Sequence, residues 1–300
     1  MRILLACIFI AAASVMAQTT PPLPAATFKD VSYGSHERHK LDVWQAKADA
    51  PTPLVIFIHG GGWSSHEKTD LPVKLLNSML ARGISVASVN YRFTSMAIMP
   101  APLHDAARAV QFLRSKAAEW KLDPQRFGGY GISAGACSVL WLALHDDLAQ
   151  AGSADPIARL STRLQVVVGL SPPTILEPEQ MIAWVGEKVM EHPVIPRCVG
   201  VKTWAEVRQH PEKWRDLLLE CSVLPHLSAD DPPILLSFPR IDPLPATSGG
   251  SAIHHAIFGM KLKEKADAVG VPCILRIQDQ AATHPTPEPE AFLLEHLTRK

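Results

Sequence analysis

Short runs of consecutive apolar residues recur along the chain, and helical patterns separate most of them. The clearest run, Leu54–Ile58, has no polar position, which is typical of a strand that helices bury on both faces. Similar runs predict strands at 84–89, 127–130, 164–170, 234–238 and 273–277, and helices are predicted at 71–82, 103–120, 134–148, 253–268 and 288–297. This alternation predicts an α/β fold with a doubly wound, mostly parallel sheet.

The first strands follow another pattern. Residues 28–33 and 40–44 alternate between apolar and polar positions, and the polar segment 34–39 joins them. Alternation of period two is typical of a strand with one face exposed. We therefore expect an antiparallel hairpin at the edge of the sheet.

One long segment, from about residue 172 to residue 229, interrupts the alternation of strands and helices. It contains three tryptophans and short helical patterns at 204–208 and 211–219. A connection of this length is too long to lack structure, so we expect a helical cap insertion over the carboxyl edge of the sheet. Most of the tryptophans are interpreted as core residues beneath the cap, and an aromatic wall for a substrate is the alternative; they are Trp184, Trp204 and Trp214.

The N-terminal residues predict export from the cell. A basic start, an apolar run and a small residue before polar positions give residues 1–17 the pattern of a secretory signal peptide. The run is shorter than the ~20 apolar residues that a membrane span needs, so we favour cleavage over a buried helix or a membrane anchor. A proline-rich linker at 18–26 and a single domain at 27–300 would follow, in a periplasmic or secreted protein with no stable membrane insertion.

Composition narrows the class of partner. The chain has 300 residues, of which 47% are hydrophobic, and a formal net charge of zero. The balance of charge argues against nucleic acid as a partner and leaves a small molecule or a polysaccharide as the expected ligand. In an exported protein Cys198 and Cys221, both in the cap, are candidates for a disulfide, and free buried thiols are the alternative.

The strongest local signal is Gly131-Ile132-Ser133-Ala134-Gly135, which follows a predicted strand and opens a predicted helix. A tight turn from strand to helix strains the backbone and needs small neighbours, and it lifts the serine hydroxyl above the sheet edge. Ser133 is therefore the candidate nucleophile. A serine that only caps an ordinary helix is the alternative.

A second glycine motif, His59-Gly60-Gly61-Gly62-Trp63, comes directly after the apolar strand at 54–58. Consecutive glycines let backbone N–H groups face a cavity, where they can stabilise the oxyanion of a tetrahedral intermediate. Phosphate binding is the weaker interpretation, because the dinucleotide-binding spacing of glycines and the P-loop lysine are both absent from the sequence.

Together the two glycine motifs resemble those of the esterase/lipase superfamily of α/β-hydrolases, especially its hormone-sensitive-lipase-like and carbohydrate-esterase-like bacterial members. Asn90-Tyr91-Arg92 and the helix segment 105–110 match as well, and in such proteins the arginine and the acidic residue look structural. The chain departs from the commoner pattern at Ala136, where many relatives have glycine, and in the segment 243–253.

A serine nucleophile needs a base, and the base needs an orienting acid. In this fold their order along the chain is serine, acid, histidine, and both partners lie in loops at strand carboxyl ends. Asp242 and His284 follow two predicted strands in this way. The rivals fit less well, because Asp231 precedes its strand, Asp279 is close to His284 in sequence, and the neighbours His254 and His255 fall at the start of a predicted helix, which we expect them to cap or line.

The resemblance implies a role for each candidate residue. Ser133 is the expected nucleophile, His284 the general base and acid, and Asp242 the carboxylate that orients it. The expected oxyanion donors are the N–H groups of Gly61, Gly62 and Ala134, and Trp63 is the expected substrate-binding residue. Such a site requires no metal and no organic cofactor.

The sequence therefore predicts a serine carboxylester hydrolase that works through an acyl-enzyme, on short-acyl or carbohydrate-linked esters of acetyl or feruloyl type. Two alternatives remain, a serine peptidase-like hydrolase on the same fold and a non-catalytic ligand-binding homologue. No pattern in the sequence indicates an oligomeric state.

Overall fold

The computed structural model describes residues 22–299, so the predicted signal peptide at 1–17 and the start of the predicted linker lie outside the described residues. The described part of the linker packs against the domain: the Trp44 indole N–H donates to the Pro24 carbonyl at 2.8 Å, and Leu23 and Ala26 contact the core. Among these residues no helix has the length and apolar character of a membrane span.

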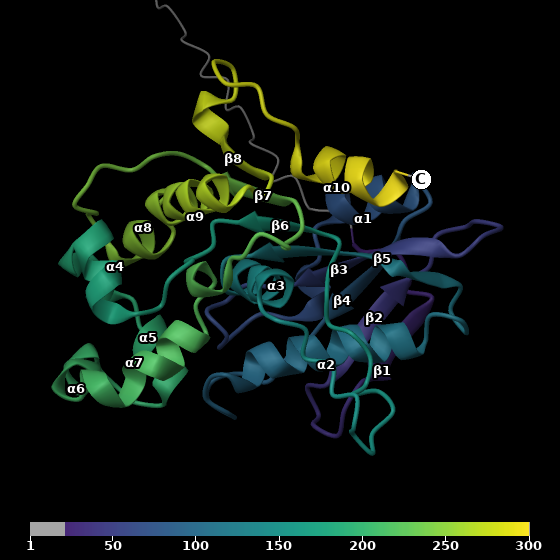
Figure 1. The fold of residues 1–300 in the computed structure, drawn as a ribbon, viewed down its shortest axis with the longest axis horizontal. Coiled ribbons are helices and arrows are strands. Elements are labelled where there is room, and N and C mark those ends of the chain that lie inside the picture. The colour runs from purple at the N-terminus through teal and green to yellow at the C-terminus, as the bar shows by residue number, and fades with distance from the viewer. Residues whose placement is uncertain (1–21, 300) are drawn as a thin grey trace, which may run out of the picture.

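An eight-stranded sheet forms the centre of the molecule (Figure 1). The strands follow the spatial order β1-β2-β4-β3-β5-β6-β7-β8. The predicted hairpin forms the antiparallel edge, because β1 pairs with β2 and β2 with β4, and all later pairs are parallel. The strands are β1 (Phe28–Ser32), β2 (Lys40–Trp44), β3 (Thr52–Ile58), β4 (Ser85–Val89), β5 (Leu122–Ile132), β6 (Val166–Leu170), β7 (Ile234–Phe238) and β8 (Cys273–Ile277).

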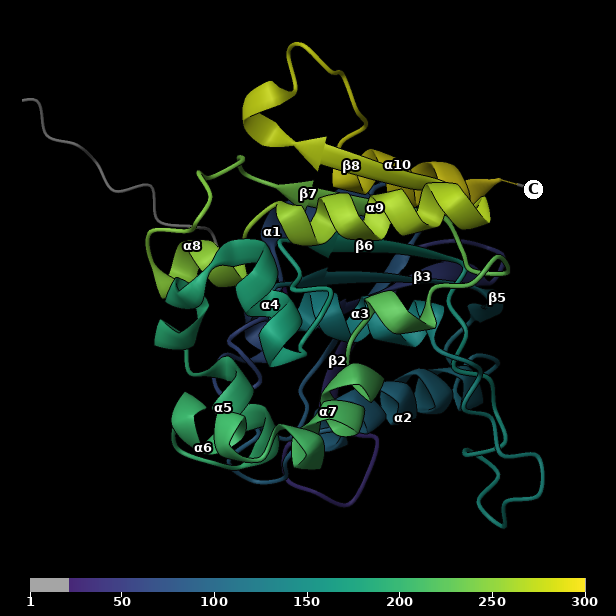
Figure 2. The same ribbon diagram turned by 60° about the vertical axis from the view of Figure 1, so that its left-hand side comes forward.

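Helices cover both faces of the sheet, as the unbroken apolar runs predict. On β3 the side chains of Leu54 and Ile56 enter a core with α2, α3 and α9, whereas those of Val55 and Phe57 enter a second core with α1 and α10. Figure 2 shows α2, α3 and α9 on one side of the sheet. These helices are α1 (Val73–Leu80), α2 (Ala101–Ser115), α3 (Ala134–Leu144), α9 (Ile257–Val269) and α10 (Pro289–Thr298).

A helical cap joins β6 to β7, as expected, and lies beyond the carboxyl ends of the parallel strands (Figure 2). Trp204 is buried within it, and its indole N–H donates to the His192 carbonyl at 2.8 Å, so this tryptophan is a core residue. Cys198 and Cys221 are free buried thiols. The cap helices are α4 (Pro178–Val185), α5 (Val194–Val199), α6 (Trp204–Gln209) and α7 (Pro211–Glu220), with short 3₁₀ turns at Glu187–Glu191 and Leu224–His226.

The connection from β7 to β8 differs from the prediction. In place of one helix at 253–268, the structure has a short helix α8 (Gly249–Ile253), a break at 254–256, and then α9. Ser248 caps α8 by accepting a hydrogen bond from the Ser251 N–H at 3.2 Å. His254 therefore ends one helix instead of lying inside another, and this change decides the geometry of the candidate site.

Candidate active site

Ser133 occupies a strained turn between β5 and α3. Its backbone has φ 53° and ψ −117°, a conformation that residues with side chains rarely adopt. The flanking glycines are required by close packing: a Cβ atom on Gly131 would lie 2.2 Å from the Gly135 carbonyl oxygen, and one on Gly135 would lie 2.0 Å from that of Ile58. The turn therefore has the geometry of a nucleophile elbow.

The imidazole of His254 lies beside the Ser133 hydroxyl. Its Nε2 is 2.8 Å from Ser133 Oγ, and its Nδ1 is 3.1 Å from the carbonyl oxygen of Gly250. A carbonyl only accepts hydrogen bonds, so the proton of a neutral ring sits on Nδ1 and Nε2 is free to accept the serine proton. Burial lowers the pKa of His254 below its usual value, against the opposing effect of the Gly250 carbonyl, and this favours the neutral ring.

The structure does not bring the expected base and acid to Ser133. His284 lies in a separate surface hollow, which it shares with Ile241 and Met260. The Asp242 carboxylate pairs with Arg240 at 2.7 Å, and its backbone carbonyl accepts from His255 Nε2 at 2.7 Å. The prediction of a contact between His284 and Ser133 is thus wrong, because the segment after β7, and not the one after β8, crosses the sheet edge above the serine.

The reason for the error is visible in the sequence. Ser248 is an N-cap signal for a helix that begins at Gly249, four residues before the start that we predicted at Ile253. That earlier start places His254 at the end of a short helix, where its side chain is available to the site. The expectation that the base lies in a loop at the carboxyl end of a strand therefore led to His284 instead of His254.

The glycine turn, residues 59–63, presents free donors to the cavity. The Tyr91 hydroxyl donates to the carbonyls of His59 and Gly60, both at 2.9 Å, and the Gly61 carbonyl accepts from the Ser64 N–H at 3.0 Å. In a trans peptide the N–H points opposite to the carbonyl, so the N–H groups of Gly61 and Gly62 point away from these partners. Neither these two groups nor the Ala134 N–H donates to an acceptor in residues 22–299.

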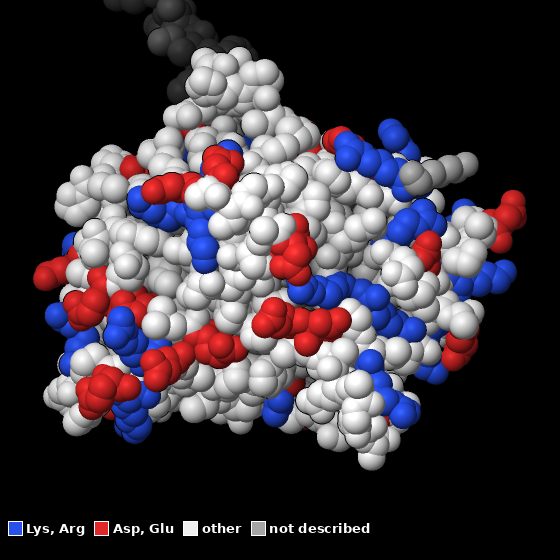
Figure 3. All heavy atoms as spheres, viewed as in Figure 1, with Lys and Arg blue, Asp and Glu red and all other residues white. Residues whose placement is uncertain are grey.

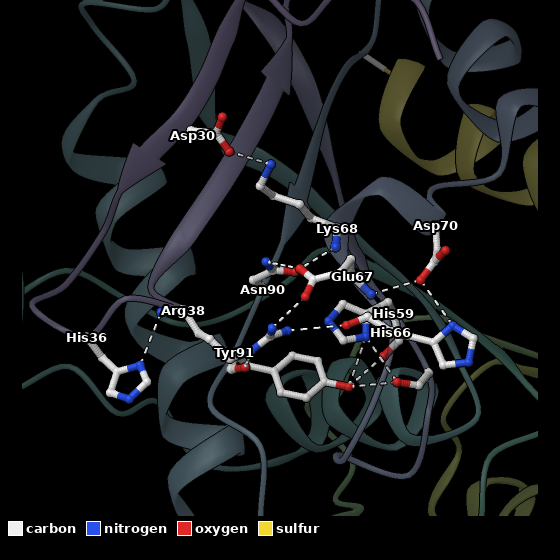
Figure 4. Close-up of polar contacts among 11 residues, drawn as sticks. Asp30, His36, Arg38, His59, His66, Glu67, Lys68, Asp70, Asn90 and Tyr91 are labelled. Carbon is white, nitrogen blue, oxygen red and sulfur yellow. Dashed lines mark hydrogen bonds and ion pairs between the residues drawn. The ribbon is translucent and has the colours of Figure 1, made fainter. Parts of the chain in front are cut away.

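A polar network braces this turn from behind (Figure 4). The Arg38 guanidinium donates to the carbonyls of Tyr91, at 2.8 Å, and of His66, and it pairs with Glu67 at 2.6 Å. Asn90 donates to the same Glu67 carboxylate at 2.5 Å. His59 is buried under this network, and burial lowers its pKa to about 4. The turn is therefore held rigidly, as pre-oriented oxyanion donors must be.

Trp63 does not have the predicted role. Its side chain is fully buried, and its indole N–H donates to the Ser138 hydroxyl of α3 at 3.0 Å. The backbone at Trp63 has φ 51°, and the residue does not line the cavity that holds Ser133. Its indole instead anchors the glycine turn to the core.

A cavity of about 640 Å³ surrounds Ser133 and His254. The glycine turn forms one wall, and the cap contributes His192 and Arg197. Burial lowers the pKa of His192, and so do the neighbouring His254 ring and the Arg197 guanidinium, since a second positive charge beside either would be unfavourable. Neither His192 nor Arg197 is predicted from the sequence as a site residue, because the cap helices carry no recognised motif.

One cluster has the composition of a metal site. Single donor atoms from His145, Glu220 and His226 lie within 4.8 Å of one another at the junction of α3 and the cap. Both histidines already form hydrogen bonds with Glu220. His145 Nε2 is 2.9 Å from the Glu220 carboxylate, and His226 Nε2 is 2.7 Å from the Glu220 backbone carbonyl. None of them lines the Ser133 cavity, so this cluster is separate from the candidate chemistry.

The fold and the elbow define the class of this protein, an α/β-hydrolase with the architecture of the esterases. The chain belongs to the BD-FAE family, whose model matches residues 41–256. It is similar to esterase LipQ of Mycobacterium tuberculosis, with 32% identity over 134 residues that make up 43% of this chain and 32% of LipQ. Neutral cholesterol ester hydrolase 1 of Mus musculus is 28% identical over 174 residues, which cover 56% of this chain and 40% of that protein.

Among solved structures, a truncated carbohydrate esterase from gut microbiota has a TM-score of 0.72 at 20% identity and covers 93% of this chain and all of that one. At this identity the likeness concerns the fold. The matched segment also spans well under half of the two curated relatives, so their activities are arguments for a function and not a demonstration of it.

Proposed function

We propose that this protein is a carboxylester hydrolase in which Ser133 is the nucleophile and His254 is the general base. The observation that carries the proposal is the 2.8 Å contact between Ser133 Oγ and His254 Nε2 at a strained elbow that opens into a cavity. A nucleophile and a base in hydrogen-bond reach are the minimum requirement for this chemistry. The esterase names of the relatives point to the same class of reaction.

In the first half of the reaction the Ser133 oxygen bonds to the ester carbonyl carbon while its proton moves to His254 Nε2. The carbonyl electron pair moves onto oxygen, where the N–H groups of Gly61, Gly62 and Ala134 are the proposed donors. When the intermediate collapses, the bond to the alcohol oxygen breaks and His254 gives its proton to that oxygen. Water then repeats the sequence on the acyl-enzyme and releases the acid.

The orientation of His254 comes from a backbone carbonyl in this proposal. In a triad the carboxylate holds the imidazole in the tautomer that leaves Nε2 free and stabilises the imidazolium. The Gly250 carbonyl, 3.1 Å from Nδ1, selects the same tautomer. It offers a dipole in place of a full charge, so we expect a working but less strongly activated serine.

We infer that the substrates are short-acyl or carbohydrate-linked esters, of acetyl or feruloyl type, that an exported enzyme meets outside the cytoplasm. The cavity of about 640 Å³ has room for a small acyl group and part of an alcohol. The carbohydrate esterase with the same fold supports this class. Export itself rests on the N-terminal sequence pattern.

The test is hydrolysis of para-nitrophenyl esters from acetate to decanoate by the mature chain, beside a Ser133→Ala variant. We expect release of nitrophenol by the wild type, a loss of at least about 10³-fold in the variant, and faster turnover of the shorter acyl chains. If both proteins are inert toward all these esters, a ligand-binding homologue becomes the better description. Equal activity in both proteins would exclude Ser133 as the nucleophile.

A further inference from the structure

Arg197 is the only arginine or lysine that lines the Ser133 cavity in the described chain. It comes from α5 of the cap and meets the glycine turn directly: its Nη1 donates to the Ser64 hydroxyl at 3.0 Å, and that hydroxyl donates to the Gly61 carbonyl at 3.1 Å. Two hydrogen bonds thus connect the guanidinium with the segment that holds the proposed oxyanion donors.

The guanidinium keeps most of its bonding capacity. An arginine side chain has five N–H donors, and its charge persists at every physiological pH. Within residues 22–299 the Ser64 hydroxyl is the one acceptor that Arg197 meets, and no carboxylate lies within ion-pair distance of it. Arg38, in contrast, makes three hydrogen bonds behind the glycine turn, one of them to the Glu67 carboxylate (Figure 4).

Asp70, the one acidic residue of the described chain that lines the cavity, does not pair with Arg197. Asp70 directs its carboxylate to His66 Nδ1 at 3.0 Å and to the Glu67 N–H at 2.8 Å, as Figure 4 shows. Over the face that Figure 3 shows, Lys and Arg side chains are interspersed with Asp and Glu side chains, so that face has no extended patch of one charge. Arg197 therefore keeps a positive charge in the cavity that no carboxylate of the described residues pairs with.

The backbone that carries Arg197 is anchored in the cap, its side chain is exposed, and space continues beyond it. Ile195 and Cys198 of α5 are fully buried, and the Cys198 carbonyl accepts from the Met99 N–H at 2.9 Å. Arg197 also borders a second hollow of about 360 Å³, lined in part by Thr94. A substrate that reaches from Ser133 past the guanidinium thus has room on both sides of it.

We propose that Arg197 is an anion subsite that selects esters carrying a carboxylate near the ester group, such as esters of acidic sugars or half-esters of dicarboxylic acids. This inference rests on the proposed hydrolase function and names its class of substrate. A planar guanidinium with unused donors matches a carboxylate in shape and charge, and such pairs are the strong hydrogen bonds of proteins. Ser64 holds the guanidinium in place beside the incoming group.

The test uses matched pairs of ligands with and without the carboxylate. Para-acetoxybenzoate and para-acetoxybenzamide place the difference on the alcohol side, and the monophenyl ester of succinate and phenyl butyrate place it on the acyl side. Calorimetry on the Ser133→Ala protein measures binding without turnover, and the wild type gives the ratio of kcat/KM values for each pair. We expect the anionic member of at least one pair to bind about 10-fold more tightly.

Variants separate this subsite from a general effect of charge. Arg197→Gln should bring the preference for the anionic ligand to about one, and Arg197→Lys should keep part of it, since the charge remains without the planar fork. The matched control is Arg215→Gln, which removes an exposed arginine of α7 that does not line the cavity, and it should leave the preference unchanged.

The two proposals fail in different ways. Equal affinity for both members of each pair, or a preference that survives Arg197→Gln, overturns the anion subsite even if neutral esters are hydrolysed. Absence of turnover for every ester overturns the hydrolase, while the binding measurements on the Ser133→Ala protein still decide the subsite.

Discussion

Replacing Asp242 by asparagine tests whether a carboxylate orients the base. In the structure the Asp242 side chain bonds to Arg240, and the Nδ1 of His254 bonds to the Gly250 carbonyl at 3.1 Å. The substitution removes the ion pair with Arg240 and leaves every contact of His254 in place. Because the Arg240 side chain is 64% exposed and the Asp242 side chain 22% exposed, solvent screens this pair, and its loss should change the free energy of unfolding little.

The expected effect on catalysis is correspondingly small. In a serine triad, replacing the aspartate by asparagine costs about 10⁴-fold in turnover, because the imidazole adopts the wrong tautomer. That factor corresponds to about 5.4 kcal/mol in the activation barrier. Here the Gly250 carbonyl keeps the tautomer, so we expect kcat/KM of Asp242→Asn to stay within about threefold of the wild type.

The assay is kcat/KM for para-nitrophenyl acetate, with thermal unfolding as a check that the variant is folded. Asp279→Asn is the matched control, since Asp279 also follows a strand, in the 3₁₀ turn Gln278–Gln280 directly after β8, and is the second acidic candidate near His284. A loss of about 10³-fold or more in Asp242→Asn, with normal unfolding, would refute orientation by Gly250 and restore the carboxylate that the sequence predicts.

Three further outcomes follow from the site and its support. Burial lowers the pKa of His254, and only its neutral form accepts a proton. The value of kcat/KM should therefore rise with pH through one ionisation below pH 6.5 and stay flat to pH 8, and an ionisation midpoint above pH 7 would contradict this. Gly135→Ala places a Cβ 2.0 Å from the Ile58 oxygen and should lower the free energy of unfolding by about 3 kcal/mol, measured in urea, so an unchanged midpoint argues against the packing. Burial lowers the pKa of His59 from 6.5 to about 4, so the unfolded chain takes up the proton first as pH falls, and the free energy of unfolding should drop by about 3 kcal/mol between pH 6.5 and pH 4. His59→Gln should reduce this dependence of stability on pH, and equal pH dependence in both proteins would count against burial of His59 as its cause.

The parts of the fold that depend on local pattern were predictable. The run Leu54–Ile58 has no polar position, and a strand with helices on both faces follows from that alone. Ser133 was found because the elbow needs Gly131 and Gly135 next to it in sequence, and the structure shows the close contacts that exclude a larger residue at either position. Steric contacts between residues close in sequence can therefore be predicted from a short sequence pattern.

Which histidine acts as the base, and which side chains line the cavity, depend on the path of long connections. No short sequence pattern determines that path. His254 and His284 both follow strands that end at the same edge, and their distances to Ser133 depend on which loop crosses that edge. Trp63 stands beside the glycines in sequence, but its positive φ and the bond to Ser138 hold the indole in the core. Arg197 reaches the cavity only because the cap folds back over the sheet.

The most direct test of the central claim, that His254 activates Ser133, is the rate at which a fluorophosphonate labels the serine. This reagent traps an activated serine without a need for the natural substrate, and intact mass with peptide mapping identifies the modified residue. We predict that the wild type and His284→Ala are labelled at Ser133 at similar rates, and that His254→Ala is labelled at least about 10²-fold more slowly. Rapid labelling of His254→Ala together with slow labelling of His284→Ala would contradict the account and place the base after β8.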